Sequence, residues 1–215
     1  MTHADLSRKQ LWSAIFTERQ ALADDLDGLD PEAWTTPSLC AGLSVREVLA
    51  HLTAGASLDW GHWMAGVIKH RFDFDAQSDM QLRRRLGDSA ADTLAQFKAA
   101  VASTTRPLPL KAVLGEIVVH GEDVRRPLGI RRDHPTATVT AVADYFQRTN
   151  MTVPSGKRAA GLRLEAADGP FTAGDGPLVS GRTIALVMAM TGRAAYGDEL
   201  DGPGAPVLLE RCASM

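Results

Sequence analysis

The sequence predicts a mainly helical α+β protein in which a four-helix bundle is followed by a small α+β domain. As far as Arg132, apolar side chains recur at the intervals of amphipathic helices. Beyond that point, short alternating segments and turns containing glycine and proline replace the helical pattern. We therefore place a boundary near residue 133, between a helical domain over 1–132 and an α+β domain over 133–215.

Four helices are predicted for the bundle. They cover about residues 5–29, 44–70, 78–104 and 110–127. Ser44 and Glu47 have the spacing of a capping box, which places the start of the second helix at Ser44. That helix is expected to continue through His51, Trp60 and Trp63, and Pro127 is expected to end the fourth helix.

The α+β domain is predicted to begin with one more helix and to contain a strand pair. A helix is expected over 136–150 and a loop over 151–161. Residues 161–166 alternate as a strand does, and residues 171–173 form the returning strand after a turn. An apolar helix follows over 183–191, and Gly192 is expected to end it.

The composition is that of a globular protein that can bury a hydrophobic core without disulfide bonds or structural metal ions. Of its 215 residues, 45% are hydrophobic and 23% are charged. The 23 basic and 26 acidic residues leave a net charge of −3, which argues against a nucleic-acid partner, because phosphate contacts need a basic surplus. Cys40 and Cys212 are far apart and predict no disulfide framework, which favours a reducing, cytoplasmic location.

No segment of the chain predicts export or a membrane. The first ten residues are polar, and the longest apolar runs fall far below the about 20 residues that a membrane helix needs. We therefore expect no signal peptide and no membrane partner. A homodimer is left open, since the sequence does not define the oligomeric state.

Glu116 and His120 are the most informative pair in the chain. They are one helical turn apart on the fourth helix, at the border of the apolar stripe that contains Val113, Ile117 and Val124. A carboxylate at the edge of a core needs a partner, because its desolvation is costly. A divalent metal is one such partner, and a solvated surface pair is the alternative.

His51 is the natural third member of such a site. It lies on a different helix, and helical bundles build metal sites from side chains on facing helices. Gly55, one turn later, is expected to leave room for a ligand. Two imidazoles and one carboxylate leave a coordination position open, which is the pattern of catalytic zinc. The alternative is a hydrogen-bonded histidine at the edge of the core.

Cys40 has two interpretations, and other catalytic motifs are absent. It is either a small plug that holds its loop on the bundle or a thiol near a helix start, where the dipole lowers its pKa. No histidine or basic residue is its neighbour in sequence, so we do not predict a nucleophile. The chain has no P-loop, no dinucleotide fingerprint and no nucleophile elbow.

Three segments resemble a known family, in the same order. Residues 34–52, WTTPSLCAGLSVREVLAHL, are similar to the N-terminal signature of the mycothiol-dependent maleylpyruvate isomerase family, which belongs to the DinB-like metal-binding four-helix bundles. Residues 116–129, EIVVHGEDVRRPLG, resemble the family's second metal segment. The C-terminal part, with Gly174-Asp-Gly-Pro, Val179-Ser-Gly and Thr191-Gly-Arg193, resembles its sterol-carrier-like domain.

The resemblance implies a site and a cofactor. It implies that His51, Glu116 and His120 bind a divalent metal, with zinc as the expected ion, and that mycothiol is the thiol cofactor. Arg193 matches the arginine that the family's C-terminal domain contributes to its active cleft, although it is also placed to cap a helix C-terminus. No residue can be assigned to cofactor binding.

The reaction stays open between two enzyme classes. A coordinated thiol becomes a thiolate that attacks a small anionic electrophile, and Arg193 is expected to hold the substrate carboxylate. Addition, rotation and elimination at a double bond make an isomerase, whereas displacement on an electrophile makes an S-transferase. The alternative class is a non-catalytic metal-binding module with a structural or regulatory role, for which a fourth protein ligand is the discriminating feature.

Overall fold

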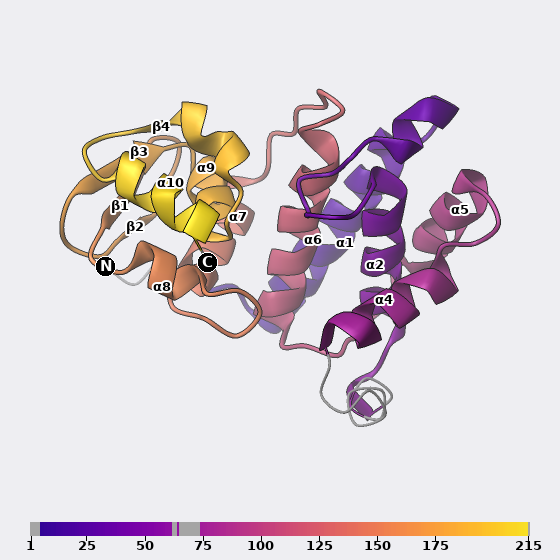
Figure 1. The fold of residues 1–215 in the computed structure, drawn as a ribbon. Helices are drawn as coiled ribbons and strands as arrows, with labels where there is room; N and C mark the ends of the chain where they lie inside the picture. The colour runs from indigo at the N-terminus through magenta and orange to yellow at the C-terminus, as the bar shows by residue number, and fades with distance from the viewer. Residues whose placement is uncertain (1–4, 62–63, 65–73, 215) are drawn as a thin grey trace. The chain divides into compact units, whose positions relative to one another are not determined.

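The fold is mainly helical with one small sheet, as predicted. The computed structural model describes residues 5–61, 64 and 74–214 (Figure 1). The chain divides into two compact units, Arg8–Arg132 and Asp133–Met215 with Met1–Ser7. We call the first the helical unit and the second the C-terminal unit. No helix in the described ranges is long and apolar enough to cross a membrane.

The helical unit is made of helices that pack against one another. Its elements are α1 (Arg8–Asp25), the 3-10 helix η1 (Pro31–Thr35), α2 (Val45–Ser57), α4 (Phe74–Arg85), α5 (Ala90–Ala100) and α6 (Leu110–Arg125). Figure 1 shows α1 beside α6, while α2 packs against α4, α5 and α6. The helices predicted over 5–29 and 110–127 are therefore confirmed, with slightly shorter ends.

The second predicted helix ends earlier than expected. α2 stops at Ser57, and Leu58 is extended. The Ser103 hydroxyl, from a distant segment, donates to the Ala56 carbonyl at 2.7 Å and takes one of the last acceptors of the helix. Trp60 is again helical, but Trp63 and residue 70, to which the prediction extended, lie outside the described residues.

The third predicted helix is two helices, so the prediction of one helix over 78–104 is wrong. α4 ends at Arg85, Gly87 takes a positive φ of 67°, and a second capping box of Ser89 and Asp92 starts α5. Arg46 of α2 donates to the carbonyls of Leu86 and Gly87, at 2.9 Å each. The break is therefore held by a side chain that periodicity alone does not reveal.

Buried ion pairs fix α6 against α1. The Arg125 side chain is almost fully buried, and its Nε donates to Asp25 Oδ2 at 2.7 Å. Arg132, just beyond α6, donates from Nε to Glu18 Oε2 at 3.0 Å. A Cβ at Gly121 would lie 2.8 Å from Arg125 Nη1, so a larger residue here would displace the Arg125 guanidinium. The orientation of α6 about its own axis is thus set.

The C-terminal unit combines a small mixed sheet with helices. Its elements are α7 (Thr136–Phe146), α8 (Ser155–Ala159), β1 (Arg163–Ala166), β2 (Thr172–Ala173), β3 (Leu178–Gly181), α9 (Thr183–Met190), the 3-10 helix η2 (Ala194–Glu199), β4 (Leu200–Asp201) and α10 (Ala205–Ser214). The strands lie in the order β2-β1-β3-β4, with β1 parallel to β3 and the other pairs antiparallel. Every residue of α9 is buried, and this helix packs between α7 and the sheet.

The predictions for this unit are confirmed in part. The predicted strand and its return strand are β1 and β2, and the predicted apolar helix is α9. This helix ends before Gly192, whose φ is 96°. The predicted loop over 151–161 contains α8, and β3, β4 and α10 were not expected from periodicity. Two-residue strands such as β4 are too short for an alternating pattern to be visible.

Candidate metal centre

α2 presents His51 at the edge of the helical core. The capping box predicted from the sequence is present: Ser44 Oγ accepts from the Glu47 N–H, and Glu47 Oε2 accepts from the Ser44 N–H at 2.8 Å. Val48 and Leu52 are buried on the adjacent face of α2. His51 is therefore half-buried rather than enclosed, with 31% of its side chain exposed.

α6 brings Glu116 and His120 to the same place. Glu116 Oε2 lies 3.6 Å from His51 Nε2 and 3.4 Å from His120 Nε2. The two imidazole rings are 5.0 Å apart between centroids and inclined by 72°. The three residues that the sequence singled out thus converge, with all three ligand atoms within 4.8 Å of one another.

These separations fit a tetrahedral cation. Both exceed the 2.7–3.2 Å typical of a hydrogen bond between nitrogen and oxygen. Ligands about 2.0–2.1 Å from a zinc ion at tetrahedral corners lie about 3.4 Å from one another. The spacing of the Glu116 and histidine atoms matches that edge length, so the donor set suits a zinc-like ion in both chemistry and geometry.

Asp123 contacts the Nδ1 atom of His120, and the sequence analysis did not predict this residue. His120 Nδ1 lies 2.9 Å from Asp123 Oδ2, and the Asp123 side chain is fully buried. A metal-ligating histidine commonly donates its other ring N–H to a carboxylate in this way, which fixes the tautomer. The available signal was the position of Asp123 three residues after His120 on the same helix.

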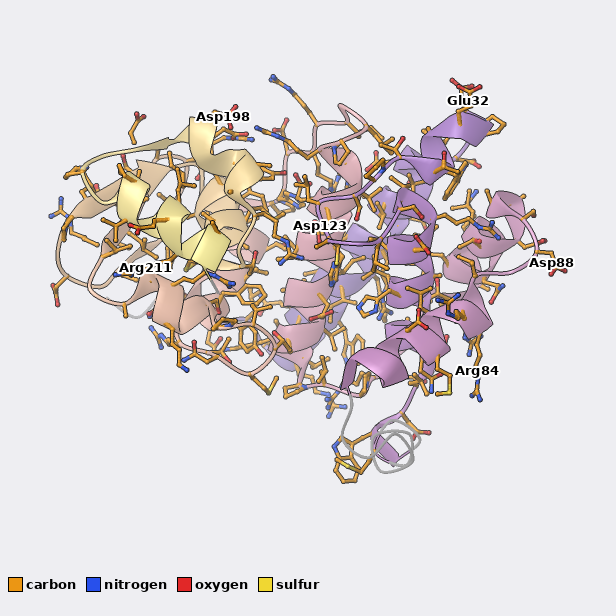
Figure 2. All side chains as sticks on the ribbon, viewed as in Figure 1. Glu32, Arg84, Asp88, Asp123, Asp198 and Arg211 are labelled. Carbon is orange, nitrogen blue, oxygen red and sulfur yellow. The ribbon has the colours of Figure 1, made fainter. Side chains whose placement is uncertain are left out.

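Cys40 also lies against His120. Its Sγ, a ring nitrogen of His120 and a carboxylate oxygen of Asp123 are within 4.8 Å of one another. Figure 1 shows the loop before α2 crossing α6, and Figure 2 labels Asp123 at that crossing. The histidine that the neighbouring sequence lacks is supplied by α6. Both cysteines are free, in agreement with the prediction of no disulfide framework.

Burial and the contacts among these side chains shift the pKa values of the site. Burial alone would raise the pKa of Glu116, but its contacts with His120 and His51 outweigh burial and hold that pKa well below its usual range. Burial would lower the pKa of His120, but contacts with Asp123, Cys40 and Glu116 outweigh it and raise that pKa well above its ordinary value. Without a metal, the site therefore favours a proton on His120.

One side of the site is accessible. The Glu116 side chain is 28% exposed, and a Cβ at Gly55, one turn after His51, would meet no atom of the described residues within 4 Å. The expected space beside His51 is therefore present. Within the described part of the chain, the metal-ligating groups are His51–Glu116–His120 and Cys40–His120–Asp123, and these contain no fourth residue grouped with the first three.

Arg193 belongs to the C-terminal unit. It follows α9, and its Nη1 donates to the Thr191 carbonyl at 2.7 Å. This contact agrees with the helix-capping interpretation, because Thr191 is the C-cap of α9. The role of Arg193 toward a substrate stays a prediction.

A family comparison bears on the helical unit. Residues 15–113 match the family described as mycothiol maleylpyruvate isomerase N-terminal domain. The chain is similar to that family over this segment. The matched segment contains His51 and Cys40, whereas Glu116 and His120 follow it. The family resemblance predicted from the sequence is thereby confirmed.

Solved structures share the fold along nearly the whole chain. A crystal structure of the mycothiol-dependent maleylpyruvate isomerase is similar at 16% identity, with a TM-score of 0.67 over 95% of this chain and 97% of that chain. A histidine-to-alanine mutant of that enzyme is similar at 15% identity, with a TM-score of 0.66 and the same coverage. None of the curated proteins matches this sequence.

Proposed function

We propose that this chain is a metal-dependent enzyme that uses a low-molecular-weight thiol. The observation that carries the proposal is the convergence of His51, Glu116 and His120 at tetrahedral ligand spacing, on an accessible face and with buried Asp123 behind His120. Zinc is the proposed ion, because two imidazoles and one carboxylate are a common ligand set of catalytic zinc. Other divalent ions, including nickel, compete for such ligands.

The similar structures supply the thiol and the first substrate to test. Both are described as mycothiol-dependent maleylpyruvate isomerase, so mycothiol is the proposed thiol and maleylpyruvate the first candidate substrate. A cation held by the three ligands would lower the pKa of a thiol bound beside it. Arg193 would hold the substrate carboxylate through two parallel hydrogen bonds.

Each residue of the centre has a definite task in this proposal. Glu116 carries the negative charge that offsets the cation, and His51 and His120 bind as neutral imidazoles. Asp123 accepts the Nδ1–H of His120 and so keeps Nε2 free as a ligand. Isomerisation requires thiolate addition to a cis double bond, rotation and elimination, whereas an S-transferase keeps the carbon–sulfur bond. Product analysis distinguishes the two.

Metal analysis of histidine variants tests the proposal. We expect one divalent ion per chain in the purified protein, and strongly reduced occupancy in His51→Ala and His120→Ala. His134→Ala is the matched control, because His134 lies outside both groups of metal-ligating residues and should leave occupancy unchanged. Full occupancy in both site variants, or a wild-type protein that binds no metal, would overturn the proposal.

A further inference from the structure

The loop before α2 holds Cys40 in a defined position. The Leu39 N–H donates to the Asp123 carbonyl at 3.0 Å, which ties the loop to α6 directly. The Cys40 N–H donates to Ser38 Oγ at 3.1 Å, and Ser38 Oγ donates to the Leu43 carbonyl at 2.7 Å. The backbone on both sides of Cys40 is therefore fixed, and its side chain is directed by the fold.

The environment of the thiol is polar. Cys40 Sγ is grouped with His120 and Asp123, and the carboxylate of Asp123 is fully buried. A buried carboxylate needs several donors, because an unsatisfied charge is costly in the interior. The Nδ1–H of His120 is one donor, and a thiol S–H is a second, weaker one of suitable size. A cysteine that only filled apolar space would not be expected beside the polar pair of His120 and Asp123.

The thiol lies beside His120 and Asp123, whose mutual contact uses the Nδ1 atom of His120. Cys40 is not grouped with His51 or Glu116, so it acts through His120 rather than as a ligand. We propose that Cys40 is a positioning residue, whose thiol and the Asp123 carboxylate together hold the His120 ring with Nε2 directed at the metal. This inference rests on the proposed metal centre.

The expected consequence is a change in metal affinity. Removing a group that orients a ligating histidine lowers metal affinity by about 10- to 100-fold. A thiol is a weaker donor than a carboxylate, so we expect Cys40→Ala to weaken metal binding about 10-fold. Cys40→Ser, which restores a donor, should remain within about 3-fold of the wild type.

Zinc dissociation constants, measured by competition with a chelating dye, test this inference. Cys212→Ala is the matched control: Cys212 is also a half-buried free cysteine, but it lies in the C-terminal unit and its Sγ contacts the Ala189 and Leu208 carbonyls. It should bind zinc like the wild type. Cobalt-loaded Cys40→Ala should also show an altered visible spectrum, because the imidazole orientation changes, and Cys40→Ser should restore it.

Thermal melting of the metal-free variants separates positioning from packing. Wild-type affinity in Cys40→Ala would overturn the inference. Equal loss of affinity in Cys40→Ala and Cys40→Ser, with equal loss of metal-free stability, would also overturn it and leave Cys40 as a plug. If the wild type itself binds no zinc, the proposed metal centre fails. If His51→Ala loses zinc and Cys40→Ala does not, only the inference fails.

Discussion

At the scale of single residues, the centre depends on Glu116. One of its oxygens lies within 3.6 Å of both imidazoles, so a single carboxylate joins α2 to α6. Against the effect of burial, these contacts lower the pKa of Glu116, and contacts with Asp123, Cys40 and Glu116 raise the pKa of His120. A proton and a metal ion are therefore alternative partners for these three side chains.

Metal retention should depend on pH for this reason. His120 must lose a proton to bind a metal, and its raised pKa means that competition begins above the ordinary value of about 6.5. We expect metal retention to fall as the pH is lowered from 8 and to be largely lost by about 4.5, where the imidazole of His120 favours the charged form. Retention that is unchanged at pH 4.5 would indicate a site without histidine ligands.

The metal-free protein should show the opposite pH trend in stability. A raised folded pKa means that His120 contributes stability fully below about pH 6.5, and that this contribution is lost as the pH rises through the folded value. Thermal melts of the metal-free protein should therefore fall in temperature as the pH rises above 6.5. His120→Gln should show a smaller fall, and identical pH profiles would refute this assignment.

At the scale of elements, two helices of ordinary geometry make the site. His51 and Gly55 are one turn apart on α2, as Glu116 and His120 are on α6, so each pair lies on one face of its helix. The Arg125–Asp25 ion pair fixes α6, and the Ser44 cap fixes the start of α2. Among the described residues, the space beside Gly55 is open, and we propose that a ligand approaches from this side of α2.

Two substitutions at Gly55 should separate helix stability from access. Gly55→Ala should raise the free energy of unfolding by about 0.5–1 kcal/mol, because it lowers the backbone entropy of the unfolded chain and its Cβ meets no atom of the described residues within 4 Å. Gly55→Leu should be similarly tolerated, but its side chain would extend back toward His51. If mycothiol binds as proposed, it should raise the melting temperature of the wild type and of Gly55→Ala, and we expect Gly55→Leu to abolish that rise. An unaltered thiol response in Gly55→Leu would contradict this view of the approach side.

At the scale of the whole molecule, the proposed functions are divided between the two units. His51, Glu116, His120, Asp123 and Cys40 all belong to the helical unit, whereas Arg193 belongs to the C-terminal unit. Metal binding should therefore be independent of Arg193, and substrate orientation should depend on it.

The kinetics of two arginine variants test this division. Arg193→Ala should lower kcat/KM for the substrate anion, while metal occupancy stays full. The expected loss corresponds to about 1.5–3 kcal/mol of transition-state stabilisation, the contribution of a hydrogen bond to a charged group. Arg211→Ala is the control, because Arg211 lies in the same unit and likewise donates to backbone carbonyls, those of Arg158 and Ala160. Equal losses of kcat/KM in the two variants would contradict a role of Arg193 in substrate binding and leave it only its structural role at the end of α9. Activity without any thiol would contradict the proposed chemistry.

The sequence by itself determined the features that depend on neighbouring residues. The start of α2 at Ser44, the extent of α6, the β1–β2 pair and the spacing of Glu116 and His120 follow from local hydrogen bonding and from helix and strand periodicity. His51 was expected as the third member because it lies on another helix of the bundle, and the family segments implied the same three ligands.

Only the tertiary structure decided the features that join distant segments. The Ser103 hydroxyl ends α2, Arg46 holds the break between α4 and α5, and the loop carrying Cys40 lies on α6 beside Asp123. Each of these contacts joins groups far apart in the chain, so no periodic pattern records them. The support behind His120 therefore came from packing, because side chains distant in sequence meet only when α2, its preceding loop and α6 come together.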